Sequence, residues 1–409
     1  MTSYQRLTLV VIFTWLAFTI SMITTRQTNN LVTQNIFQLD PYFTYGQNLL
    51  SGQGYRNCGF DPISLTCLSN ANADRAYRLP VYPLMLTPIL IIGNGMTPQA
   101  IALALCLQSA LWGATVGLSV GLACRWGLPA ALCTGFLLLL STSAYYLAGL
   151  LMTEISFTFG VMLWLYSLLR SKYTWHWLIS GILFGILLEW RGVLLVGLPF
   201  FVAWIGFRRS LIIFLFGMSL PVAVWTARNY TIFNAFVPFS TGSGVVLYGA
   251  NNPKIFSYAP GVWENPIYLE DYELFKDLPE LQQDRAFQSA ALEFLRGLDI
   301  SYLIFALIFK VLAFFGFYDA LVWKINLLMT GGIFIWSLID KRRRRSRWRL
   351  WRRDPVVTLC LWLIATGILN TLIFWADYRM RFPFEPALCL VASAFLMNHK
   401  TQASATQRA

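Results

Sequence analysis

Long apolar runs, separated by short polar stretches, dominate the pattern of the chain. A helix of about 20 apolar residues spans the hydrocarbon core of a bilayer. Only helices or closed barrels satisfy the backbone there. The pattern therefore predicts an all-α polytopic membrane protein with about ten transmembrane helices, at residues 7–24, 98–123, 128–150, 154–170, 175–190, 192–207, 210–227, 321–340, 356–375 and 383–397.

Two further apolar runs fit a span poorly. Residues 80–93 are short and contain three prolines, which indicates a re-entrant or surface-lying helix. Residues 300–317 carry Lys310 near their middle, and a lysine there fits a helix that lies at the membrane interface. We expect neither run to span the membrane on its own.

Three polar segments complete the organisation of a single membrane domain, residues 1–409. Residues 26–97 and 229–302 form long loops, which we expect on the outer side and which carry the surface-lying helices. Apolar residues at helical spacing predict an amphipathic helix from about Leu281 to Gly297, with Phe287, Ala291, Phe294 and Leu295 on one face. Residues 341–355 form a basic loop on the cytoplasmic side.

Composition and charge support this organisation. The chain is 57% hydrophobic and 12% charged, which excludes a soluble globular domain of this length. Nine of the 31 basic residues lie in residues 341–353, so the net charge of +12 is a topology signal that places both termini in the cytoplasm. The same clustering favours contact with anionic membrane lipids and argues against a nucleic-acid partner.

Histidine and cysteine usage excludes several metal sites. With two histidines and no Cys-x-x-Cys pair, the chain has neither a histidine-rich site nor a zinc ribbon. Cys58 and Cys67 lie in the first outer loop. They are either a disulfide that closes a small loop or two unpaired thiols.

Two carboxylates are candidates for chemistry at the outer surface. Asp40 precedes Pro41 and a predicted helix, so it caps that helix whatever else it does. Glu154 follows Thr153 at the outer end of a span, where an acid favours the helix dipole. Either carboxylate is a candidate for proton transfer, and together they are candidate ligands of a divalent cation.

Arginines gather at the outer ends of spans and surface helices. Each one alone is equally explained as an anchor that snorkels to the interface. As a set they suit the capture of a lipid-linked phosphate, because guanidinium binds phosphate bidentately. Glu189 is a candidate partner for the nearby Arg191, and Tyr82 is either a sugar contact or an interfacial aromatic residue. The arginines are Arg78, Arg191, Arg228, Arg379 and Arg381.

Several motifs in order resemble the GT-C superfamily of membrane glycosyltransferases, which use polyprenyl-phosphate-linked sugars. The nearer likeness is to the group that contains protein O-mannosyltransferases and aminoarabinose transferases. Pro41 and Thr44 stand where that family often has a second acid and a tyrosine. The motifs are Asp40 with the helix that ends at 49–55, Arg78 to Leu84 including Tyr82, Thr153-Glu154, Arg228-Asn229, Ser240 to Gly242, 249–253, and Arg379 to Pro383.

The resemblance implies an inverting transfer of a sugar from a polyprenyl-phosphate donor to an acceptor on the outer face of the membrane. The modest size of the outer loops favours a bacterial plasma membrane over the endoplasmic reticulum. The resemblance implies that Asp40 is the catalytic base and that Glu154 shares its cavity. It also implies that Arg78, Arg228 with Asn229, and Arg381 hold the donor. The alternatives are a lipid or polysaccharide flippase and a non-catalytic polysaccharide-assembly subunit.

Overall fold

Helices make up the regular structure of the part of the chain that the computed structural model describes, apart from two isolated β-bridges. The described residues are 1–32, 42–57, 74–206, 208–260, 262–264, 272–317, 319–339, 354–375 and 377–396. The bundle contains α1 (Ser3–Val32), α4 (Pro98–Ala123), α5 (Leu128–Leu139), α6 (Thr142–Ala148), α7 (Glu154–Leu169), α8 (Thr174–Leu188), α9 (Leu198–Ile205), α10 (Arg209–Phe233), α16 (Ile325–Ile339), α18 (Pro355–Ile373) and α20 (Glu385–Leu396).

The helices of this bundle are those of an integral membrane protein. Within the described residues four helices are long and apolar enough to cross a membrane. They are α1 over Ser3–Arg26, α4 with the turn that follows it over Pro98–Trp126, α10, and α18. The number rises to six if each of two bent helix pairs forms one span. The predicted all-α class is confirmed, whereas the predicted count of ten spans is not.

Several predicted spans are broken into shorter pieces. The run at 128–150 becomes α5 and α6, bent by 53°. The run at 192–207 becomes a 3₁₀ turn, Gly192–Gly197, followed by α9, whose second residue is Pro199. Proline fits the first turn of a helix but not its interior, so it favours a new start at this point.

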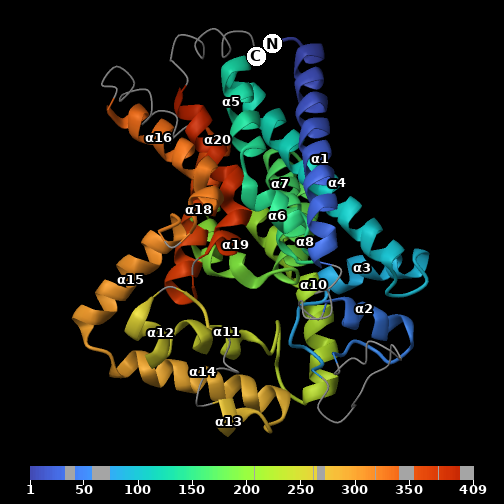
Figure 1. Ribbon diagram of the computed structural model, residues 1–409, viewed down its shortest axis with the longest axis vertical. Helices are drawn as coiled ribbons and strands as arrows, with labels where there is room; N and C mark the ends of the chain where they lie inside the picture. The colour runs from blue at the N-terminus through green and yellow to red at the C-terminus, as the bar shows by residue number, and fades with distance from the viewer. Residues whose placement is uncertain are drawn as a thin grey trace.

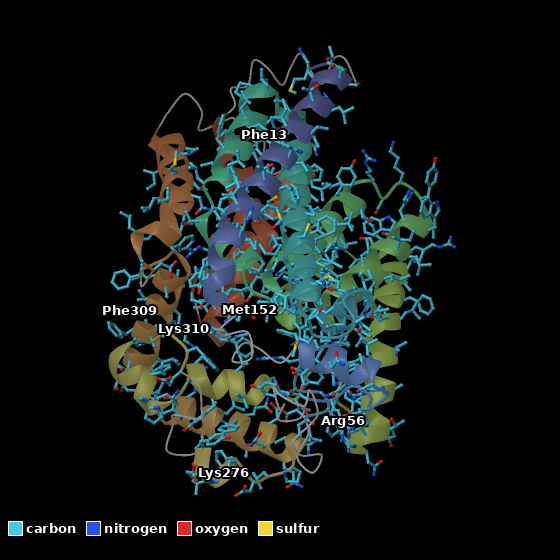
Figure 2. The ribbon with its side chains drawn as sticks, turned by 45° about the vertical axis from the view of Figure 1, so that its right-hand side comes forward. Phe13, Arg56, Met152, Lys276, Phe309 and Lys310 are labelled. Atoms are coloured by element: carbon cyan, nitrogen blue, oxygen red, sulfur yellow. The ribbon has the colours of Figure 1, made fainter. Side chains whose placement is uncertain are left out.

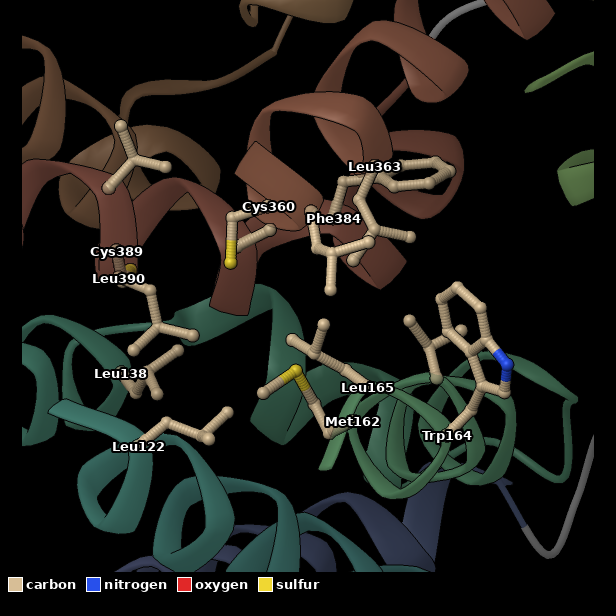
Figure 3. Packing of buried hydrophobic residues seen from close by; sticks show 14 of the residues in the cluster. Leu122, Leu138, Met162, Trp164, Leu165, Cys360, Leu363, Phe384, Cys389 and Leu390 are labelled. Atoms are coloured by element: carbon tan, nitrogen blue, oxygen red, sulfur yellow. The ribbon is translucent and has the colours of Figure 1, made fainter. Parts of the chain in front are cut away.

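Large apolar side chains and small residues together pack the bundle. Trp164, Leu363 and Phe384 belong to its principal core cluster (Figure 3). Glycine lets two helices approach closely, because a Cβ on Gly181 would lie 2.1 Å from the carbonyl oxygen of Phe214. Close contact through small residues is the usual way that membrane helices pack, and here it joins α8 to α10.

The two long loops together form a layer at the end of the molecule opposite the N-terminus (Figure 1). We call the described residues of 42–80 and 234–297 the loop layer. Its helices are α2 (Tyr42–Leu50), α11 (Ser243–Ala250), α12 (Pro253–Tyr258), α13 (Tyr272–Phe275) and α14 (Glu280–Gly297). The predicted amphipathic helix is α14, whose Phe287 and Ala291 are buried as expected.

Two apolar helices connect the loop layer to the bundle. The predicted surface helix at 80–93 is α3 (Val81–Ile92), whose 12 residues span only about 18 Å. The run at 300–317 forms α15 (Ile300–Phe314), which turns by 118° from α14. Lys310 does not face a membrane interface, because its side chain is only 2% exposed.

Lys310 instead holds the loop layer against the end of α18. Lys310 and the preceding Phe309 lie on α15 (Figure 2). The Lys310 ammonium donates to Asn251 Oδ1 at 2.7 Å and to the carbonyl of Leu372 at 3.3 Å. Asn251 Nδ2 also donates to the carbonyl of Ile373 at 3.0 Å. A cation and an amide thus satisfy terminal carbonyls of α18, where the helix dipole is negative.

Glu280 joins the two loops. Its carboxylate accepts hydrogen bonds from the backbone N–H groups of Arg75 at 2.6 Å and Ala76 at 2.8 Å, and from the hydroxyl of Thr241. The first residue of α14 therefore fixes the segment that leads to Arg78. Charged acceptors make the stronger class of hydrogen bond.

Candidate active site

Glu154 and two of the predicted arginines form one ion-paired cluster around a buried carboxylate. The carboxylate of Glu154 is 1% exposed at the start of α7. Its Oε1 accepts from Arg379 Nε at 2.9 Å, and lies 2.8 Å from Arg379 Nη2 and 3.1 Å from Arg191 Nη1. The structure thus brings together three residues that are far apart in sequence and that we expected at the outer end of the bundle.

The second carboxylate oxygen of Glu154 takes no part in these ion pairs. Glu154 Oε2 is buried and has no hydrogen-bond partner among the described residues. Thr153 does not cap α7 through its side chain, and its hydroxyl accepts instead from Arg191 Nη1 at 3.4 Å. The cluster therefore holds two guanidinium groups in place by one carboxylate oxygen.

A cavity of about 580 Å³ lies beside this cluster, between the loop layer and the bundle. Met380 connects the two, because it lines the cavity and its sulfur accepts from Arg191 Nη2 at 3.2 Å. One wall is apolar and comes from the bundle, with Leu195 and Val196. Polar side chains reach the cavity from the loop layer, among them Arg78, Ser243, Asp284, Arg285 and Gln288.

Arg78 is the predicted phosphate ligand that lines the cavity. Its guanidinium carbon lies 4.7 Å from the ring centre of Tyr77 and 5.6 Å from that of Tyr42. Tyr55 fixes the backbone at this point by donating its hydroxyl to the carbonyl of Arg78 at 2.8 Å. Tyr82 is fully buried and packs edge-on against Tyr42, so it supports the aromatic surroundings of Arg78.

Arg228 and Asn229 hold loops in the structure. Arg228 donates from Nη1 to the carbonyl of Arg75 at 2.6 Å and from Nη2 to the carbonyl of Tyr55 at 2.8 Å. Asn229 is fully buried, and its Nδ2 donates to the carbonyl of Val237 at 2.9 Å. These bonds shape the loop layer around the cavity, and a substrate contact by either residue stays a prediction.

Arg381 belongs to a separate buried group at the start of α20. It is fully buried, and its Nη1 lies 2.7 Å from Asp319 Oδ2 while its Nε lies 3.4 Å from Glu385 Oε1. Ser141 donates to the same glutamate, at 2.7 Å from Oε2. Arg381 is thus engaged by two carboxylates.

Asp40 lies outside the described residues, as do Cys58 and Cys67. Among the residues that are described, no three His, Cys, Asp or Glu side chains gather as a metal site would require. The catalytic role of Asp40, the disulfide and a divalent cation shared by Asp40 and Glu154 all remain predictions.

Carboxylates of the loop layer have raised pKa values. Burial and the negative charge of Glu280 raise the pKa of Asp74 to about 6. Burial also raises the pKa of Asp284 to about 6, although that carboxylate accepts from the N–H of Gly244 at 2.6 Å. The loop layer therefore binds protons in the range of pH in which ordinary carboxylates have lost them.

Sequence reasoning missed three polar groups and assigned one pair wrongly. Leu281, Asp284, Arg285 and Gln288 stand at positions i, i+3, i+4 and i+7 of α14, and this helical spacing is the signal that would have found Arg285 and Gln288. Asn370 gives no such signal, since it is a lone amide in an apolar run. Arg191 pairs with Glu154 rather than with Glu189, whose two carboxylate oxygens are buried without a partner among the described residues.

Two solved structures similar to the chain are those of ArnT from Cupriavidus metallidurans. The apo form is 13% identical over 94% of this chain and 77% of that chain, with a TM-score of 0.36. The form bound to undecaprenyl phosphate is 14% identical over 97% of this chain and 79% of that chain, with a TM-score of 0.38. Comparison with protein-family models and with curated proteins returns no match.

Proposed function

We propose that the chain is a GT-C glycosyltransferase that moves a sugar from a polyprenyl-phosphate donor to an acceptor, with inversion. The observation that carries this proposal is the composition of the cavity walls. An isoprenoid chain suits the apolar wall with Leu195 and Val196, and a phosphate suits the guanidinium of Arg78. The order of the motifs along the chain supports the same class of enzyme.

The proposed reaction is a single displacement. Asp40 takes the proton of the acceptor hydroxyl or amine while that atom bonds to the anomeric carbon of the sugar. The bond from the anomeric carbon to the phosphate oxygen breaks on the opposite side, and its electron pair stays on the lipid phosphate. Arg78 neutralises the charge that develops there.

In this proposal Glu154 is a positioning residue. Its Oε1 holds Arg191 and Arg379, and Arg191 contacts Met380 at the cavity wall. Two fixed cations beside the cavity raise the local positive potential for an anionic donor. The loop layer then faces the outer side of a bacterial inner membrane, and both termini face the cytoplasm, as the positive-inside rule favours.

The test uses purified protein in nanodiscs with a panel of undecaprenyl-phosphate sugars and candidate acceptors. We expect the wild type to release undecaprenyl phosphate, Asp40→Asn to bind the donor without release, and Arg78→Ala to bind the donor at least tenfold more weakly, as expected for a charge-assisted contact. The matched control is Arg296→Ala, an exposed arginine at the end of α14 that does not line the cavity.

Other outcomes would point to the alternatives. Full activity of Asp40→Asn would refute its role as base. Movement of the lipid between leaflets without release would favour a flippase. Absence of both activities, with normal polysaccharide assembly in cells that carry Asp40→Asn and Glu154→Gln together, would favour a non-catalytic assembly subunit.

A further inference from the structure

Asn370 is a buried amide in an apolar wall. It lies in the last turn of α18 and is 3% exposed. It lines the cavity together with Ile373 and Phe374 of the same segment. A carboxamide offers two donors and an acceptor. Within the described residues no hydrogen bond reaches the side chain of Asn370.

The end of α18 does not need Asn370. Lys310 and Asn251 already bind the carbonyls of Leu372 and Ile373. The polar atoms of the Asn370 side chain are not among the fully buried atoms that lack a partner, so the amide opens onto the cavity. Its donors and acceptor are therefore available to a molecule that enters the cavity.

The loop layer supplies a second amide to the same cavity. Gln288 on α14 lines it, as does Arg285 one turn earlier. Two carboxamides from different elements, beside apolar surface, suit a neutral ring that carries several hydroxyl groups, since each hydroxyl both donates and accepts. Arg78 lines the cavity as well and suits the charged part of the same ligand.

We propose that Asn370 is a specificity-determining residue, whose carboxamide hydrogen-bonds a ring hydroxyl of the sugar that the lipid phosphate carries. This assignment rests on the proposed function. In this assignment two residues bind two parts of the donor. Arg78 binds the phosphate that all donors share, and Asn370 contacts a hydroxyl group whose orientation differs between sugars.

The neighbouring residue provides a matched control. Thr371 is also fully buried, and its hydroxyl also lacks a partner among the described residues. Unlike Asn370, it does not line the cavity. Replacing each with an apolar residue of similar size removes a polar group from the end of α18, but only Asn370→Leu should change what the cavity binds.

The experiment measures thermal unfolding and binding in nanodiscs for the wild type, Asn370→Leu and Thr371→Val. The probes are undecaprenyl phosphate and a series of undecaprenyl-phosphate hexoses that differ in one hydroxyl orientation. For Asn370→Leu we expect unchanged affinity for undecaprenyl phosphate. We also expect about tenfold weaker binding of the hexose that the wild type prefers, with less discrimination among epimers. Thr371→Val should only raise the unfolding temperature.

Three results would overturn the inference. One is wild-type affinity and discrimination in Asn370→Leu, and another is an equal loss of affinity for undecaprenyl phosphate. The third is a wild type that does not discriminate between the epimers. The proposed function fails separately, if the wild type releases no undecaprenyl phosphate with any donor and acceptor. Normal release by Asn370→Leu with unaltered sugar preference would remove this inference and leave the function intact.

Discussion

Replacing Glu154 by glutamine tests whether this carboxylate positions the two arginines. The change keeps the shape of the side chain but removes the charge that Arg191 and Arg379 share. Removing one partner of a fully buried ion pair costs about 3–5 kcal/mol. The arginine side chains are 13% and 31% exposed, so solvent partly screens them. We therefore expect a loss of about 2–3 kcal/mol in the free energy of unfolding.

The assay compares unfolding of the wild type, Glu154→Gln, Arg379→Gln and the double variant in nanodiscs. The double variant removes one charge of each sign, so it should be more stable than the sum of the two single changes predicts, by about 1–2 kcal/mol. Glu293→Gln, an exposed acid on α14, is the matched control and should be neutral. Strict additivity of the two changes would refute the shared ion pair as the source of the stability.

Activity separates positioning from proton transfer. Glu154→Gln should raise the KM for the lipid donor, because Arg191 and Arg379 lose their fixed positions. Its remaining activity should keep the wild-type dependence of kcat on pH, since Asp40 is the proposed base. Loss of the acidic limb of that profile would show that Glu154 itself carries the proton, and would contradict its role as a positioning residue.

Two further predictions concern the loop layer. The raised pKa of Asp74, about 6, means that the folded protein binds this proton more tightly than the unfolded chain does. Its contribution to stability is complete below the ordinary pKa of 3.8 and is lost as the pH rises to about 6. Asp74→Asn should therefore flatten the fall in unfolding temperature measured between these two pH values, and an unchanged fall would contradict this. Lys310→Met should lower the free energy of unfolding by about 1–3 kcal/mol, because it leaves two acceptors without donors. Asn251→Leu should cost more, since it leaves a buried ammonium with one acceptor, and denaturation of both variants tests this order.

Much of the architecture could be predicted from periodicity. The amphipathic helix predicted at 281–297 is α14. Apolar residues that recur every three to four positions identify the face of a helix that is buried. The short run with three prolines forms the short helix α3. The breaks in α5–α6 and before α9 were not predicted, since hydropathy over a window does not register a bend within an apolar run.

The partners of the charged residues could be predicted much less well. Glu154, Arg191 and Arg379 were all expected at the outer end of the bundle, and the structure joins them. Nothing in the sequence shows that Arg228 donates hydrogen bonds to backbone carbonyls or that Arg381 forms ion pairs with two carboxylates. A guanidinium takes whichever acceptor the tertiary fold brings near, and these acceptors lie far away along the chain.

The contacts of Glu280 have a consequence for the order of assembly. Glu280 follows Arg75 by 205 positions and Ala76 by 204 positions in the chain. The segment at Arg75 and Ala76 is therefore synthesised long before its partner. At about 5–20 residues per second, synthesis of the intervening chain takes roughly 10–40 s. During that interval the first loop lacks the carboxylate that later anchors it. Closure of the cavity is thus a late event in biogenesis, timed by the emergence of α14 rather than by insertion of the first helices.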